Sequence, residues 1–108
     1  MQVVGQIEEY FFTYSNGVNP ECFIKIKDIT TGEYFLIIIE NKPNGNSEKF
    51  NQFYNENNYY SFIGAREIID TELISTIPYS IQEDYRDVDV FMIAELWTLE
   101  KDIEIFLF

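Results

Sequence analysis

Six consecutive apolar residues, from Tyr34 to Ile39, constrain the fold of this chain more than any other feature of its sequence. Successive side chains of a strand point to opposite faces of the sheet, so this run places apolar groups on both faces. A strand that is apolar on both faces must be covered on both faces. The segment 33–40 is therefore predicted to be a central strand.

Five more segments predict strands, because apolar residues fill them or alternate with polar ones between turn residues. These segments are 2–14, 22–30, 59–69, 88–98 and 103–108. Strict alternation places Val3, Ile7 and Phe11 on one face of the first strand. Along 88–98, the same rule puts these residues on one side: Asp89, Phe91, Ile93, Glu95 and Trp97. Gly64, inside 59–69, indicates a β-bulge.

One segment predicts a helix, over about 46–57. Phe50, Phe53 and Tyr54 stand at i, i+3 and i+4 and form one apolar stripe, while Asn46 or Ser47 can cap the first turn. The expected fold is one α+β domain over 1–108, in which this amphipathic helix packs on a mainly antiparallel twisted sheet of about six strands.

The predicted order of elements is three strands, a helix and then further strands. This order resembles that of an OB-like fold, which implies a partly open Greek-key barrel as the alternative architecture. The resemblance rests on element order alone. The oligonucleotide binding that it implies conflicts with the charge of the chain.

Composition excludes several kinds of chemistry. The chain has no histidine and a single cysteine, Cys22, so it lacks His-based nucleophile systems, imidazole metal sites and intramolecular disulfides. Cys22 stands in an apolar run and is predicted to be a core residue. We therefore expect no enzymatic activity, no cofactor and no metal.

Charge limits the partners. There are 19 acidic and 7 basic side chains, which gives a net charge of −12. Neither nucleic acid nor an anionic membrane suits such a chain, because both are bound through lysine and arginine. No signal peptide and no apolar run of membrane-spanning length is found, so the expected location is the cytoplasm.

Acidic residues are densest in segment 83–89, which is predicted to be a loop that leads into a strand. Asp87 and Asp89 with Glu83 and Asp84 could ligate a divalent cation, or two carboxylates could act as an acid/base pair, but neither spacing is diagnostic. A protein-binding surface is the preferred interpretation, because aromatic anchors lie nearby. The predicted partner-binding residues are Tyr79, Glu83, Asp84, Tyr85, Asp87, Asp89, Glu95 and Trp97.

Taken together, the sequence predicts a small acidic inhibitor that binds and neutralises a basic protein. The preferred role is an immunity protein that blocks a bacterial toxin nuclease. The alternatives are a phage-encoded anti-defence inhibitor that mimics nucleic acid, as anti-CRISPR proteins do, and an acidic secretion chaperone. A monomer is favoured.

Overall fold

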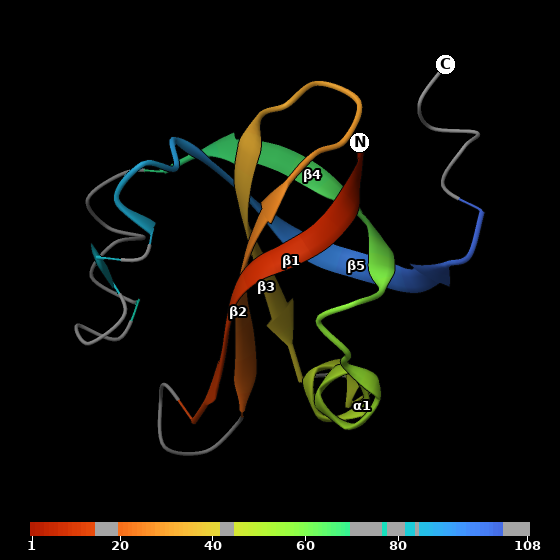
Figure 1. The fold of residues 1–108 in the computed structure, drawn as a ribbon. Coiled ribbons are helices and arrows are strands. Elements are labelled where there is room, and N and C mark those ends of the chain that lie inside the picture. The colour runs from red at the N-terminus through yellow and green to blue at the C-terminus, as the bar shows by residue number, and fades with distance from the viewer. Residues whose placement is uncertain (15–19, 42–44, 70–76, 78–81, 84, 103–108) are drawn as a thin grey trace.

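Five strands and one helix form the described part of the chain (Figure 1). The computed structural model describes residues 1–14, 20–41, 45–69, 77, 82–83 and 85–102. Within those residues no helix is long and apolar enough to cross a membrane. The elements are β1 (Gln2–Thr13), β2 (Glu21–Lys27), β3 (Tyr34–Glu40), α1 (Asn46–Phe53), β4 (Tyr59–Ile68) and β5 (Val90–Glu100).

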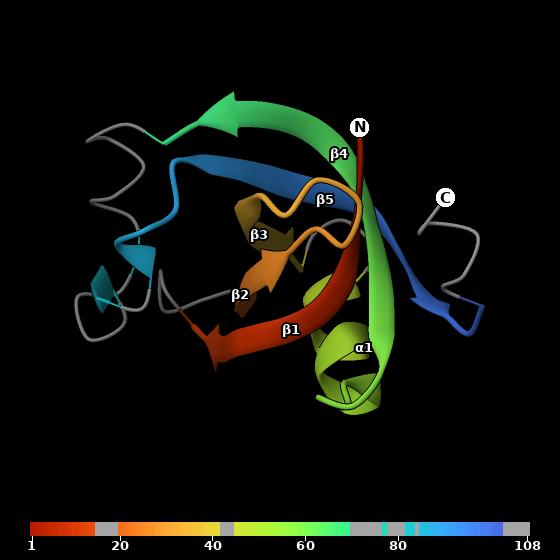
Figure 2. The same cartoon turned by 45° about the horizontal axis from the view of Figure 1, so that its top comes forward.

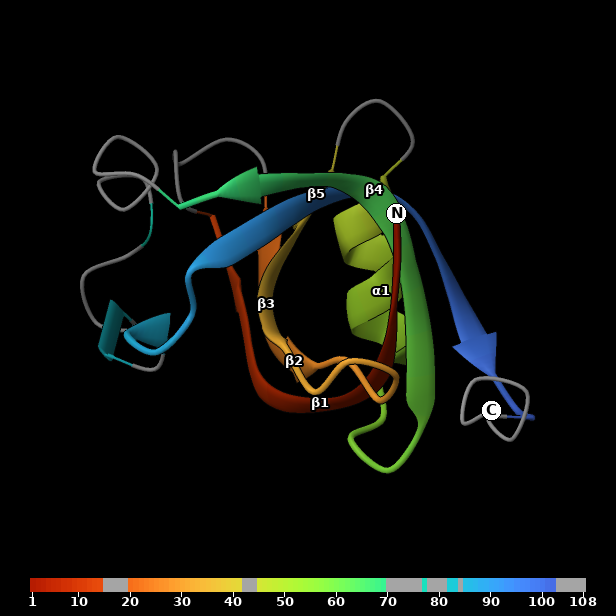
Figure 3. The same ribbon diagram turned by 90° about the horizontal axis from the view of Figure 1, so that it is seen from above.

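The strands pair in a closed ring in the order β1-β2-β3-β5-β4, which the view from above shows surrounding the interior (Figure 3). Four pairings are antiparallel, and the pairing of β3 with β5 is parallel. The sheet is therefore mixed: it is mainly antiparallel, as expected, but contains one parallel pairing that was not predicted. β3 lies between β2 and β5, so the prediction of a central strand at 33–40 is confirmed.

β1 closes the ring because it pairs with two neighbours. Its first half pairs with β4 and its second half with β2. At Gly5 the strand passes so close to β2 that a Cβ atom would meet the carbonyl oxygen of Lys27. A bulge at Glu8 then shifts the register and bends the strand. After the bulge Tyr10 turns toward the interior and Phe11 turns outward, so the predicted shared face of Val3, Ile7 and Phe11 is wrong.

Inside the ring lies the first of two hydrophobic clusters, and α1 covers one end of it (Figures 1 and 2). Phe50 is fully buried there, and its ring centroid lies 5.2 Å from that of Tyr60 and 5.1 Å from that of Trp97. Phe53, predicted to share this stripe, is 67% exposed. The helix packs on the sheet as expected, but through a narrower apolar face.

The helix begins differently from the prediction. Gly45 is the N-cap residue and makes no side-chain hydrogen bond, so neither Asn46 nor Ser47 caps the helix. Instead, Oδ1 of Asn41 accepts a hydrogen bond from the backbone N–H of Glu48 at 3.3 Å. An oxygen from outside the helix thus satisfies one of the free N–H groups of the first turn.

A second hydrophobic cluster lies outside the ring. Its sheet residues point outward from β2, β3 and β5, and described residues of the connection between β4 and β5 cover them. The members are Phe23, Leu36, Ile38, Ile77, Tyr85, Val88 and Phe91. β3 is therefore covered on both faces, as its apolar run requires. The predicted sixth strand, 103–108, lies outside the described residues.

Candidate protein-binding surface

The described part of the acidic segment 83–89 lies in the connection between β4 and β5. Glu83 forms an ion pair with Arg86, three residues further on. Asp87 accepts a hydrogen bond from Nζ of Lys25, on β2, at 2.7 Å. Asp89 is exposed, and its carbonyl oxygen accepts a hydrogen bond from the N–H of Ile69 at 2.9 Å. The predicted site residues Asp84 and Tyr79 lie outside the described residues.

The ion pair between Lys25 and Asp87 fastens this connection to the ring. Its hydrogen bond holds the pKa of the Asp87 carboxyl below the ordinary value of 3.8 and raises the pKa of Lys25 above 10.5. The Lys25 ammonium also lies 5.1 Å from the centroid of the Tyr34 ring, within the range of a cation–π contact. Asp87 therefore has a structural partner within the chain.

Tyr85 lies in the second hydrophobic cluster and is only 5% exposed. The expectation of a projecting loop placed this ring on the surface. The outward apolar side chains of β2 and β3, such as Phe23 and Ile38, need a cover, and Tyr85 belongs to it. In this structure its ring packs against the sheet and does not project.

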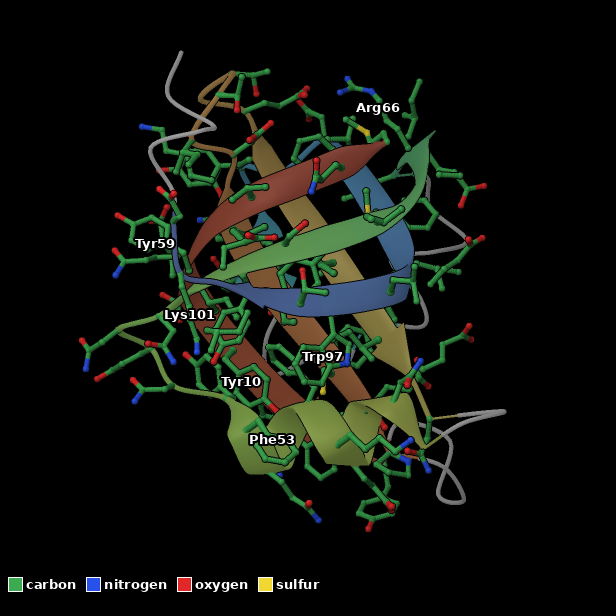
Figure 4. All side chains as sticks on the ribbon, turned by 90° about the vertical axis from the view of Figure 1, so that its right-hand side faces the viewer. Tyr10, Phe53, Tyr59, Arg66, Trp97 and Lys101 are labelled. Carbon is green, nitrogen blue, oxygen red and sulfur yellow. The ribbon has the colours of Figure 1, made fainter. Side chains whose placement is uncertain are left out.

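Trp97 and Glu95 are separated by a break in the alternation of β5. Leu96 pairs with Ile63 and Ala94 pairs with Gly64, so Glu95 is an extra residue that bulges from the strand. Beyond the bulge Trp97 turns toward the first cluster and meets the Phe50 ring at 87°. Figure 4 shows Trp97 between β5 and α1. The prediction that Trp97 shares a side with Asp89 is therefore wrong.

The structure pairs two carboxylates that were not predicted as a group, and the strand that carries a third, Glu95, runs beside them. Glu21 of β2 and Glu40 of β3 are direct cross-strand partners. The parallel register pairs Ile38 with Ile93, and two further steps would place Glu40 opposite Glu95. The neighbours Cys22 and Ile39 point into the interior, so Glu21 and Glu40 lie on the outer face, and Glu95 is exposed at the bulge of β5. We call Glu21, Glu40 and Glu95 the carboxylate row.

Two members of the carboxylate row, Glu40 and Glu95, are exposed. Among the described residues, neither Glu40 nor Glu95 forms an ion pair. Like charges directly opposite one another destabilise a sheet. An external cation would therefore be attracted to Glu40 and Glu95 at this end of the outer face.

Exposed apolar side chains lie beside the carboxylate row. Ile63 and Leu96 face each other across β4 and β5 and are 39% and 61% exposed. Ile93 lies next to Ile38 of the second cluster and is 38% exposed. We call Ile63, Ile93 and Leu96 the apolar patch. An apolar centre beside charged groups is the arrangement of a protein interface.

Metal binding and thiol chemistry have little support among the described residues. Over the described ranges, no three histidine, cysteine, aspartate or glutamate side chains are grouped to hold a metal ion. Cys22 is fully buried, as predicted, and burial raises the pKa of its thiol to about 12. A pocket of about 380 Å³ lies in the connection, with Ile77 and Val88 among its apolar walls and the Glu83–Arg86 pair at its lining.

Comparison with protein-family models and with curated protein sequences found no match to this chain.

Proposed function

We propose that this chain is a small acidic inhibitor that binds a basic protein in a one-to-one complex and neutralises it. The preferred target is a toxin nuclease, which would make the chain an immunity protein. The proposal places it in the cytoplasm, where a single free thiol such as that of Cys22 is stable.

One observation carries this proposal: the carboxylate row lies directly beside the apolar patch. Carboxylates that oppose each other within the chain would gain charge-assisted hydrogen bonds from a partner's lysine or arginine. The exposed Leu96 and Ile63 would supply the desolvated centre that makes such contacts strong. The net charge of −12 would also steer a basic partner toward the surface.

We also infer that the ring is an OB-like barrel. The helix between β3 and β4, the parallel pairing of β3 with β5 and the sharing of β1 between two neighbours support this inference. Oligonucleotide binding is not part of the proposal. That fold binds nucleic acid on the face of its second and third strands. Here Tyr85 and Val88 cover that face, and the chain is acidic.

The test begins with capture. The tagged chain is used to isolate its partner from the cells that produce it, and mass spectrometry identifies the partner. The purified partner is then assayed for nuclease activity while the chain is added in increments. We expect activity to fall linearly to zero at one equivalent and the affinity to weaken at high salt. A partner with no basic surface, or one whose activity survives excess chain, would refute the proposal.

Matched charge variants locate the surface. Glu40→Lys/Glu95→Lys should weaken binding by about tenfold or more, because a cation of the partner would then face two more cations. Glu8→Lys/Glu67→Lys changes the net charge by the same amount at exposed positions away from the carboxylate row, and binding should change little. Equal losses in the two double variants would show that only net charge matters.

A further inference from the structure

Among the described residues, the strand β5 has one neighbour along its last half. It pairs with β4 from Val90 to Glu100, but with β3 only through Phe91, Met92 and Ile93. From Glu95 to Glu100, no backbone hydrogen bond within the described residues reaches the other edge. A strand edge of this kind is a template for another strand.

The pairing of β3 with β5 ends two residues before Glu40 would face Glu95. Glu40 already faces Glu21 on its other side. Continued pairing would set Glu40 and Glu95 directly opposite each other, and like charges in that position destabilise a sheet.

The unpaired half of β5 is also unusually apolar for an edge. Leu96 is 61% exposed on one face and Leu99 is 42% exposed on the other, where Trp97 is half-buried (Figure 4). Edge strands are usually protected by charge, proline or a cover. Apolar groups on both faces of one edge are suited to burial by an added strand, whose side chains alternate between the two faces.

We propose that the β5 edge from Glu95 to Glu100 accepts an extended basic segment of another protein as an added strand. This inference goes beyond the proposed function, because strand addition requires neither a nuclease nor inhibition. Glu40 and Glu95 lie at one end of the edge, and Glu100 and Asp102 lie at the other, so a lysine or arginine near each end of the added strand would meet two carboxylates.

Charge distinguishes the foreign basic segment from two other segments that could occupy this edge. A second copy of the chain would bring Glu95 and Glu100 against the same residues, which is a repulsive arrangement. The chain's own residues 103–108 contain one carboxylate, Glu104, and no cation. A foreign basic segment would bring cations to both ends of the edge, including the end where Lys101 alone lies among Glu100 and Asp102.

The test uses three synthetic peptides with the full-length chain. The first alternates lysine and valine over eight residues, the second replaces its lysines with glutamate, and the third replaces two of the first peptide's valines with proline. Trp97 is the chain's single tryptophan and lies at the edge, so its fluorescence reports binding. We expect saturable binding of the basic peptide, with slower hydrogen exchange at the amides of residues 95–100. The acidic and the proline peptides should produce neither effect, because the first is repelled and the second cannot pair as a strand.

Two variants and two controls complete the test. Glu95→Lys/Glu100→Lys should weaken binding of the basic peptide by about tenfold or more, whereas Glu8→Lys/Glu67→Lys should bind like the unmodified chain. Equal binding of the proline peptide would show charge attraction alone and would overturn the proposal. Protection in the free chain of those amides of residues 95–100 that do not donate to β4 would also overturn it. A chain ending at Asp102 and a dilution series would then assign that protection to residues 103–108 or to a second copy.

Discussion

Glu21 of β2 and Glu40 of β3 lie directly opposite each other in a hairpin that contains no other like-charged pair. The remaining pairs bring apolar residues together or set a lysine against an apolar or aromatic partner. A like-charge pair in an otherwise favourable register costs stability. Such a pair is expected at a surface that meets a partner of opposite charge.

The first prediction concerns this pair. Glu40→Gln should raise the free energy of unfolding by about 0.2–1 kcal/mol, because it removes a repulsion between cross-strand partners. Urea denaturation measures the change. Glu9→Gln is the matched control, since Glu9 faces Lys25 in the register of β1 and β2 and its removal should bring no gain. A loss of stability in Glu40→Gln would mean that the two carboxylates do not repel each other.

The second prediction concerns Tyr85. Because its side chain is buried against β2 and β3, Tyr85→Ala should cost about 3–5 kcal/mol of folding stability. Tyr85→Phe conserves the ring and should cost less than about 1.5 kcal/mol. Thermal denaturation followed by circular dichroism distinguishes the two. If Tyr85→Ala melts like the unmodified chain, the ring is not part of a packed cluster.

The third prediction is a pH dependence. The pKa of Asp87 is lowered in the folded chain, so its ion pair with Lys25 stabilises the fold above pH 3.8 and is lost as the pH falls below it. The pKa of Lys25 is raised, so the same contribution is present below pH 10.5 and is lost as the pH rises past it. Asp87→Asn should therefore be less stable than the unmodified chain at neutral pH. The two stability curves should converge at both extremes, and a difference that persists at pH 2 would exclude the ion pair as its cause.

The fourth prediction concerns the closure of the ring. Gly5→Ala should destabilise the chain by about 1–3 kcal/mol, because the new methyl group would meet the backbone of Lys27. Its neighbour Gln6 is exposed, and Gln6→Ala should stay within about 0.5 kcal/mol of the unmodified chain. Chemical denaturation of the pair of variants provides the comparison. Equal stabilities would show that β1 can move away from β2 without cost.

Much of the fold follows from sequence patterns. The apolar run in β3 and the alternation in β2 gave strands whose positions differ from the observed ones by a few residues at most. The faces were harder to predict. A period of two assigns faces only until a bulge adds a residue, and the bulges at Glu8 and Glu95 reversed the assignment for half of β1 and β5. Gly64 of β4 indicated the second bulge, but the extra residue, Glu95, lies on the facing strand β5.

Locating the proposed binding surface required the register of the strands more than the composition of the chain. The densest acidic segment drew attention to residues 83–89, where Lys25 and Arg86 already pair with Asp87 and Glu83. The pair of Glu21 and Glu40 could have been found by extending the hairpin outward from its turn near Gly32. Glu95 could not have been added to them, because the parallel register of β3 and β5 comes from tertiary structure.

The parallel pairing of β3 with β5 has a consequence for the time at which the carboxylate row forms. Residues 36–38 pair with residues 55 positions later in the chain, and contacts between such distant residues form slowly. During synthesis the hairpin of β2 and β3 can form early, since its strands are neighbours. The third carboxylate arrives only after β5 has left the ribosome and the ring has closed. The proposed binding surface would therefore be complete only after the ring closes, and a partially folded chain would present only two of the three charges.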